Sequence, residues 1–174
     1  GAMVVHKGRL YAVPAYSEGL FRYEGGTTWS PCGSPGFRLM SLHSDDDAIV
    51  CAANESGGVF LTDGEGSWAS AAPLPADVDQ TYSFAVHDNA LHIGTWPDGK
   101  VHRLEDGAWK DTGRLGEELE VMAMASFNGK FYGGSLPAAD LYRLDAEASE
   151  PGWSWIANLD PTPDVKYRRA WSMA

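Results

Sequence analysis

Three arginines recur at equivalent positions of a repeated segment, and each is followed two residues later by an acid. The pairs are Arg22 with Glu24, Arg103 with Glu105, and Arg143 with Asp145. Three arginines could hold a substrate carboxylate if their side chains converged on one point. Repeat-equivalent residues are spread apart instead, and side chains two residues apart lie on the same side of a strand. We therefore expect structural ion pairs, and no catalytic residue is predicted.

Histidines also recur at one repeat position, as His6, His43 and His87, with Phe127 in the fourth copy. Neutral imidazoles are common metal ligands, so several of them could surround an ion. A position that also accepts Phe is more simply a packing position. The acids Asp45–Asp47 lack the alternating ligand spacing of an EF-hand loop. The sequence therefore predicts neither a metal site nor a cofactor.

Aromatic and charged residues gather in the loops that follow the second and fourth strands of the repeat. Because strand direction alternates within each copy, these loops should share one face, where ligand sites are common. Aromatic rings can stack on the apolar faces of sugars while carboxylates accept from hydroxyls. The predicted ligand-binding residues are Trp96, Tyr16, Asp98, Asp140, Tyr167 and Arg168. The alternative for Trp96 is packing against the neighbouring repeat.

The elements that must position these residues form a fourfold repeat with a spacing of about 40 residues. The third strands begin at Leu20, Val59, Val101 and Leu141, and a closing tryptophan follows at Trp29, Trp68, Trp109 and then Trp153 or Trp155. Four short strands per repeat of this length are typical of β-propeller blades. We expect one all-β domain over 1–174, with four four-stranded blades at about 4–40, 41–84, 85–124 and 125–174. Residues 1–2 resemble a tag remnant.

The turns between the first and second strands agree with this prediction. Lys7-Gly8, Asp88-Asn89 and Asn128-Gly129 occupy these places. Tight hairpin turns need positive φ, which favours Asn, Asp and Gly.

The two ends of the chain match parts of one strand. The tail "RAWSMA", residues 169–174, resembles the start of an inner strand, whereas the amino end begins in the middle of one. A closed four-bladed ring, a segment of a longer propeller and a homodimer joined through the terminal strands are all compatible with this pattern. Two-fold pairing would bury both exposed edges, which favours the homodimer.

Composition excludes some partners. The formal net charge of −11 disfavours nucleic acid, whose binding depends on Lys and Arg neutralising phosphates. No apolar run approaches the length of a membrane span, so membrane insertion is not predicted, and nothing indicates a compartment. Cys32 and Cys51 are expected to be two buried thiols rather than a disulfide or a zinc site.

A short motif, "YEGGTTW" at residues 23–29, preserves Glu24, Gly26, Thr28 and Trp29 of a sialidase Asp-box, with Arg22 where the box has Ser. Over essentially the whole chain, the repeat pattern resembles the kelch, galactose-oxidase and sialidase-like propeller repeats of bacterial proteins. In that superfamily such boxes are structural turns, so the resemblance implies a fold and no substrate.

Two functions remain open from the sequence. The first is a non-enzymatic binding or assembly module that presents its loop face to a protein or glycan partner. The alternative is a portion of a glycan-processing enzyme of the sialidase or oxidase type, whose full catalytic set is not present in this chain. Fold alone does not decide between them.

Overall fold

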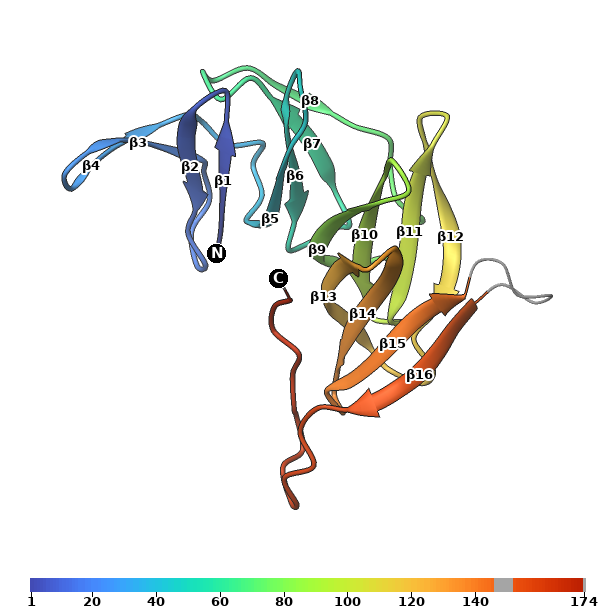
Figure 1. Cartoon of the computed structure of the whole chain (residues 1–174). Coiled ribbons are helices and arrows are strands. Elements are labelled where there is room, and N and C mark those ends of the chain that lie inside the picture. Colours follow the sequence, from blue (N-terminus) through green and yellow to red (C-terminus); the bar gives the residue numbers. More distant parts are fainter. Residues whose placement is uncertain (146–151, 174) are drawn as a thin grey trace. The chain divides into compact units, whose positions relative to one another are not determined.

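The computed structural model describes residues 1–145 and 152–173 and contains 16 strands in four antiparallel sheets (Figure 1). In each sheet the strands are neighbours in chain order. Sheet 1 comprises β1 (Ala2–His6), β2 (Arg9–Val13), β3 (Phe21–Gly25) and β4 (Thr28–Pro31), and sheet 2 comprises β5 (Leu39–Ser44), β6 (Ile49–Ala53), β7 (Val59–Thr62) and β8 (Trp68–Ser70). Sheet 3 comprises β9 (Gln80–His87), β10 (Ala90–Trp96), β11 (Lys100–Glu105) and β12 (Ala108–Arg114), and sheet 4 comprises β13 (Glu120–Phe127), β14 (Lys130–Leu136), β15 (Asp140–Asp145) and β16 (Gly152–Asn158).

The chain divides into two compact units, Gly1–Thr81 and Tyr82–Ala174. The first unit contains sheets 1 and 2. The second contains sheets 3 and 4, apart from the first two residues of β9. Within the described residues, no helix is long and apolar enough to cross a membrane.

The hairpin turns between first and second strands have the geometry that their residues predict. Lys7-Gly8, Asp88-Asn89 and Asn128-Gly129 all have positive φ, between 45° and 77°. This is the backbone shape of a tight turn that matches the right-handed twist of its two strands. The turn prediction is confirmed in these three sheets.

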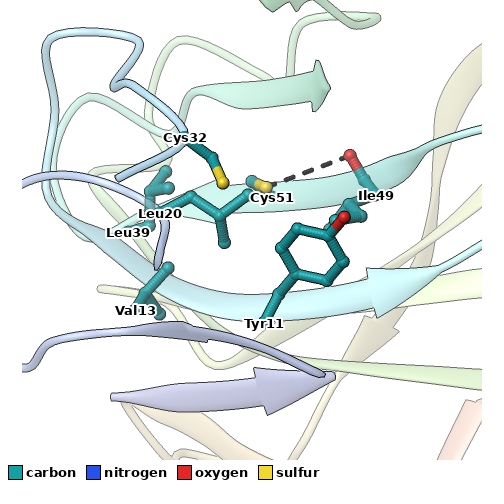
Figure 2. Packing of buried hydrophobic residues seen from close by; sticks show 7 residues of the cluster. All are labelled: Tyr11, Val13, Leu20, Cys32, Leu39, Ile49 and Cys51. Atoms are coloured by element: carbon teal, nitrogen blue, oxygen red, sulfur yellow. Dashed lines mark hydrogen bonds between the residues drawn. The ribbon is translucent and has the colours of Figure 1, made fainter. Parts of the chain in front are cut away.

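The core of the first unit lies between its two sheets (Figure 2). It contains Tyr11, Val13, Leu20 and Cys32 from sheet 1 and its exit, and Leu39, Ile49 and Cys51 from sheet 2. Both cysteines are buried free thiols, as predicted. Burial raises the pKa of both thiols, that of Cys51 to about 12.

The core of the second unit repeats this arrangement. Val101 and Leu115 of the sheet 3 region pack with Val121, Phe131 and Tyr142 of sheet 4, and all five are buried. In both units, therefore, most of the apolar surface is buried between sheets rather than within one.

Close approach between sheets 3 and 4 requires a glycine. A Cβ on Gly94 of β10 would lie 2.7 Å from the carbonyl oxygen of Val121 on β13. Gly134 of β14 has the same surroundings, because its Cβ would lie 2.6 Å from the Cβ of Ala170. Ala170 therefore packs against β14 at the position where Val121 packs against β10.

The segment after β16 is held in that place by backbone hydrogen bonds (Figure 1). The amide of Arg168 donates to the Pro137 oxygen at 2.9 Å, and the amide of Ala170 donates to the Ser135 oxygen at 3.2 Å. This segment covers sheet 4 as the inner strand of a further sheet would.

The strand register identifies the closing tryptophan of the fourth repeat. Trp29 pairs with Tyr23, Trp109 with Leu104 and Trp153 with Leu144, at equivalent positions of their sheets. Trp155 pairs with Tyr142, two residues further along the ladder. Trp153 is therefore the repeat residue. Its ring lies 5.6 Å from that of Phe131, and it approaches Gly113 of β12, so this tryptophan packs on the preceding sheet.

Gly94→Ala should destabilise the protein by about 1–3 kcal/mol, because the added methyl meets the backbone of β13. Gly152→Ala is the matched control, since no atom of the described residues lies within 4 Å of the position of its added Cβ and it also occupies a strand. Urea denaturation of both variants measures the difference. Equal unfolding midpoints would show that sheets 3 and 4 have room to separate at this contact.

Candidate functional site

Trp96 ends β10 and begins the loop that joins it to β11. The Trp96-Pro97 peptide bond is cis, and the tryptophan side chain is half-buried. Gly99 then turns the chain with a φ of 59°, and its amide donates to the Leu119 oxygen at 2.8 Å. The loop that carries Trp96 is thus fixed to the connection between sheets 3 and 4.

Asp98 is part of a small charge cluster in the same loop. Its Oδ2 lies 3.2 Å from the ammonium nitrogen of Lys100, which also lies 3.3 Å from Oδ2 of Asp111. Asp98 and then Asp111 raise the pKa of Lys100 through these hydrogen bonds. The other oxygen of Asp98 is buried and has no partner among the described residues. The Oδ2 oxygen beside Lys100 is therefore the one through which this partly exposed carboxylate can meet a ligand.

Glu118 lies in the same region, and its carboxylate is hydrogen-bonded within the protein. It is buried, and its Oε2 accepts from the Ser135 hydroxyl at 2.8 Å and from the Ala138 amide at 3.0 Å. A buried carboxylate with two donors joins the connection before β13 to the loop after β14. Glu118 is therefore a structural residue.

Asp140 and Arg168 are also held by intramolecular bonds. Asp140 Oδ1 accepts from the Asn158 amide at 2.7 Å, and Arg168 Nη1 donates to the Asp160 oxygen at 2.8 Å. Beside Arg168, the ring of Tyr167 remains 50% exposed, with the Lys166 ammonium 5.1 Å from its centre.

The structure places five of the six predicted site residues in the second unit. Tyr16 belongs to the first unit, in the loop between β2 and β3, where its side chain is 91% exposed. In the second unit, Trp96 and Asp98 lie in the loop after β10. Asp140 lies at the start of β15, and Tyr167 and Arg168 lie in the segment after β16.

The repeat histidines bond across neighbouring sheets within each unit. His6 Nδ1 lies 2.9 Å from the Ser44 hydroxyl, and His87 Nδ1 lies 2.7 Å from the Ser126 hydroxyl. No group of three or more His, Cys, Asp or Glu side chains among residues 1–145 and 152–173 could hold a metal ion.

Two of the three repeat arginines form the predicted ion pairs. Arg22 Nε donates to Glu24, and Arg143 Nε donates to Asp145, both at 2.8 Å. Each arginine lowers the pKa of its acid. Arg103 differs, because its Nε is buried and has no hydrogen-bond partner in the described part of the chain.

Beside Arg103 lies a hollow of about 240 Å³ that was not predicted from the sequence. It is lined by His87, His92 and Thr112, among others. The signal available in the sequence was weak: His92 stands across from Arg103 where the first repeat has Tyr11 across from Arg22.

His92 is the most strongly perturbed group in this hollow. It is 2% exposed, and burial lowers its pKa to about 4, so it is neutral at pH 7. His87 and Arg103 lower this pKa further, while the Ala90 oxygen and Asp88 oppose the shift. The Phe131 ring lies 4.6 Å from the His92 ring and contributes to the burial.

No protein-family model matches the chain, and no curated protein matches it. Among solved structures, the chain is similar to virginiamycin B lyase from Staphylococcus aureus, with 10% sequence identity and a TM-score of 0.74, over 94% of this chain and 56% of that chain. It is also similar to YCF48 from Cyanidioschyzon merolae, with 13% identity and a TM-score of 0.65, over 92% of this chain and 56% of that one. A third structure, YCF48 bound to D1 peptide, has 15% identity and a TM-score of 0.62, over 88% of this chain and 51% of that one.

These similar structures are β-propellers, and at such low identity they show the fold alone. The chain is a β-propeller protein with four four-stranded sheets as blades, as the sequence predicted. It spans about half the length of each of these three solved chains, 56% in the case of the lyase. Without a matching family model, the finer resemblance to kelch and sialidase-like repeats depends on the repeat pattern alone.

Acidification should weaken the fold through His92. Its pKa is about 4 in the folded state and 6.5 ordinarily, so the unfolded chain takes up the proton first as the pH falls. The free energy of unfolding should therefore decrease between pH 6.5 and pH 4, by about 3 kcal/mol. Urea denaturation across this range, compared between the wild type and His92→Gln, measures the contribution. Equal slopes in the two proteins would assign the acid sensitivity to other groups.

Proposed function

We propose that this β-propeller is a non-enzymatic binding module that presents its loop face to a protein or glycan partner. The observation that carries the proposal is that some loop residues are bonded within the chain while an aromatic ring beside them is exposed. Asp140 and Arg168 are held by intramolecular hydrogen bonds, while the neighbouring ring of Tyr167 is 50% exposed. An aromatic ring on a rigid support costs little entropy to immobilise, which favours binding.

Trp96 and Asp98 extend this surface within the second unit. Trp96 is half-buried in a loop with two fixed ends, and the carboxylate of Asp98 is partly exposed beside Lys100. A ring beside an acceptor suits a backbone amide or a sugar hydroxyl.

Between the two partner classes, we favour a segment of protein. The support is the similar propeller YCF48, which has been solved with a D1 peptide. A glycan is the other outcome of the experiment below.

The enzymatic alternative has less support in the described residues. A glycan-processing enzyme of the sialidase type would need arginines free to hold a substrate carboxylate. Arg22 and Arg143 are instead bonded to acids of their own strands. The lyase activity named for one similar structure belongs to that protein.

Trp96→Ala and Tyr167→Ala should each weaken binding at least about tenfold, equivalent to 1.4 kcal/mol, with little change in melting temperature. Screening the wild type on peptide and glycan arrays identifies a ligand, and titration of the variants follows. Trp155→Ala is the matched control, because its ring is 58% exposed on β16 at the edge of sheet 4. If Trp96→Ala unfolds the protein, Trp96 is a packing residue and only Tyr167 tests the surface. The loop-face proposal is wrong if Tyr167→Ala binds the ligand as tightly as the wild type does.

Assembly of two copies through the terminal strands is a second proposal. Met3 and Val5 of β1 are 70% and 61% exposed. On sheet 4, Phe127 is 72% exposed beside a hollow of about 300 Å³, whose lining includes Tyr132 and Met173. Exposed apolar strands of this kind favour pairing with another chain. Light scattering should then show a dimer, and a mass of 18.8 kDa at high concentration would exclude it.

A further inference from the structure

The hollow beside Arg103 lies toward the end of β10 opposite Trp96, and its lining residue Asp111 is joined to Asp98 of the loop face through Lys100. Its lining comes from the β9–β10 hairpin, from β11 and β12 of sheet 3, and from Leu144 of sheet 4. The volume of about 240 Å³ is small for a ligand pocket and suits a molecule of a few heavy atoms.

In the first unit, the space in front of the equivalent arginine is occupied by a carboxylate. Arg22 faces Tyr11 across β2 and β3, as Arg103 faces His92 across β10 and β11. The Nη1 atom of Arg22 donates to both carboxylate oxygens of Glu65, each at 2.7 Å, and Glu65 belongs to the next sheet's β7–β8 turn. A carboxylate therefore fits the space in front of this arginine position.

In the second unit, that carboxylate is missing from the described residues. No ion pair of Arg103 is found among those residues, and its Nε is buried there without a hydrogen-bond partner, although the side chain as a whole is only half-buried. A buried N–H group without an acceptor loses the hydrogen bond that it makes in water, so an acceptor beside Arg103 would be stabilised.

The other groups in the hollow favour a single negative charge with a small apolar part. His92 is buried and His87 stacks on Phe131, with ring centres 4.8 Å apart and planes 5° apart, so this wall is rigid and aromatic. Leu144 adds an apolar surface. Asp88 and Asp111 also line the hollow, and their charges oppose a dianion such as phosphate.

We propose that this hollow binds a small monocarboxylate, held by a charge-assisted hydrogen bond from Arg103. The guanidinium group takes the role toward the ligand that Arg22 takes toward Glu65. The short apolar part of the ligand lies against Leu144 and the histidine rings. This site goes beyond the proposed loop-face function and does not depend on it.

Titration of the full chain with sodium butyrate, at constant ionic strength, tests the site. The Nε–H resonance of Arg103 in ¹⁵N-labelled protein should shift saturably, with a Kd of about 1–10 mM. Phosphate and chloride at equal ionic strength should leave the resonance in place. An absent or unsaturable butyrate shift up to about 100 mM would overturn the proposal, as would an equal shift with chloride.

Variants separate this site from a general effect of charge. Arg103→Lys, followed through the backbone amide resonance of His92, should reduce butyrate binding about tenfold, because it keeps the charge and loses the planar fork, and its melting temperature checks the fold. Arg143→Gln is the matched control at the same repeat position, since Arg143 is occupied by Asp145. It should leave the Kd unchanged, and an equal loss in both variants would contradict the assignment.

A carboxylate of the chain itself could compete for Arg103. Glu147 follows Asp145 by two residues, as Glu65 follows Asp63, and it lies outside the described residues. In Glu147→Gln, the Arg103 Nε–H resonance should stay at its wild-type position before butyrate is added. A shift in this variant alone, or butyrate binding that requires this substitution, would make Glu147 the native occupant and overturn the proposal.

Discussion

Within each unit, the packing of the first sheet's second strand against the inner strand of the next sheet determines the rest of the fold. A four-stranded sheet of this size has two faces and no helix in the described residues to cover them, so its apolar side chains must be buried against another sheet. The contact is close at Gly94, where even a methyl group would meet the backbone of Val121. Residues far from this point, such as the closing tryptophans, then fill the wider space at the outer strands.

This constraint explains which parts of the fold were predictable. Turn residues such as Asn128 and Gly129 are determined by backbone shape, which is local and therefore visible in sequence. The third strands and the closing tryptophans recur at a fixed spacing because the two sheets of each unit pack on one another through repeated positions. Only the choice between Trp153 and Trp155 needed the strand register.

The candidate site was less predictable, because its chemistry depends on partners from different strands. The sequence gathers acids and aromatic residues in the loops, but it does not show that Glu118 is satisfied by Ser135 and Ala138 or that Asp140 is bonded to Asn158. Arg103 was expected to behave as Arg22 and Arg143 do. Its own strand has the same kind of acid two residues later, Glu105, so the sequence pattern does not show the difference.

The place of Ala170 against Gly134 has a consequence for how such a protein can evolve. The contact uses a small residue on one strand and a short stretch of backbone on the other, and the same contact occurs at Gly94 with Val121. A gene duplication that copies one repeat therefore supplies both halves of a working interface at once. Blades can be gained or lost in whole units without compensating substitutions, while the loops at each new blade are free to diverge.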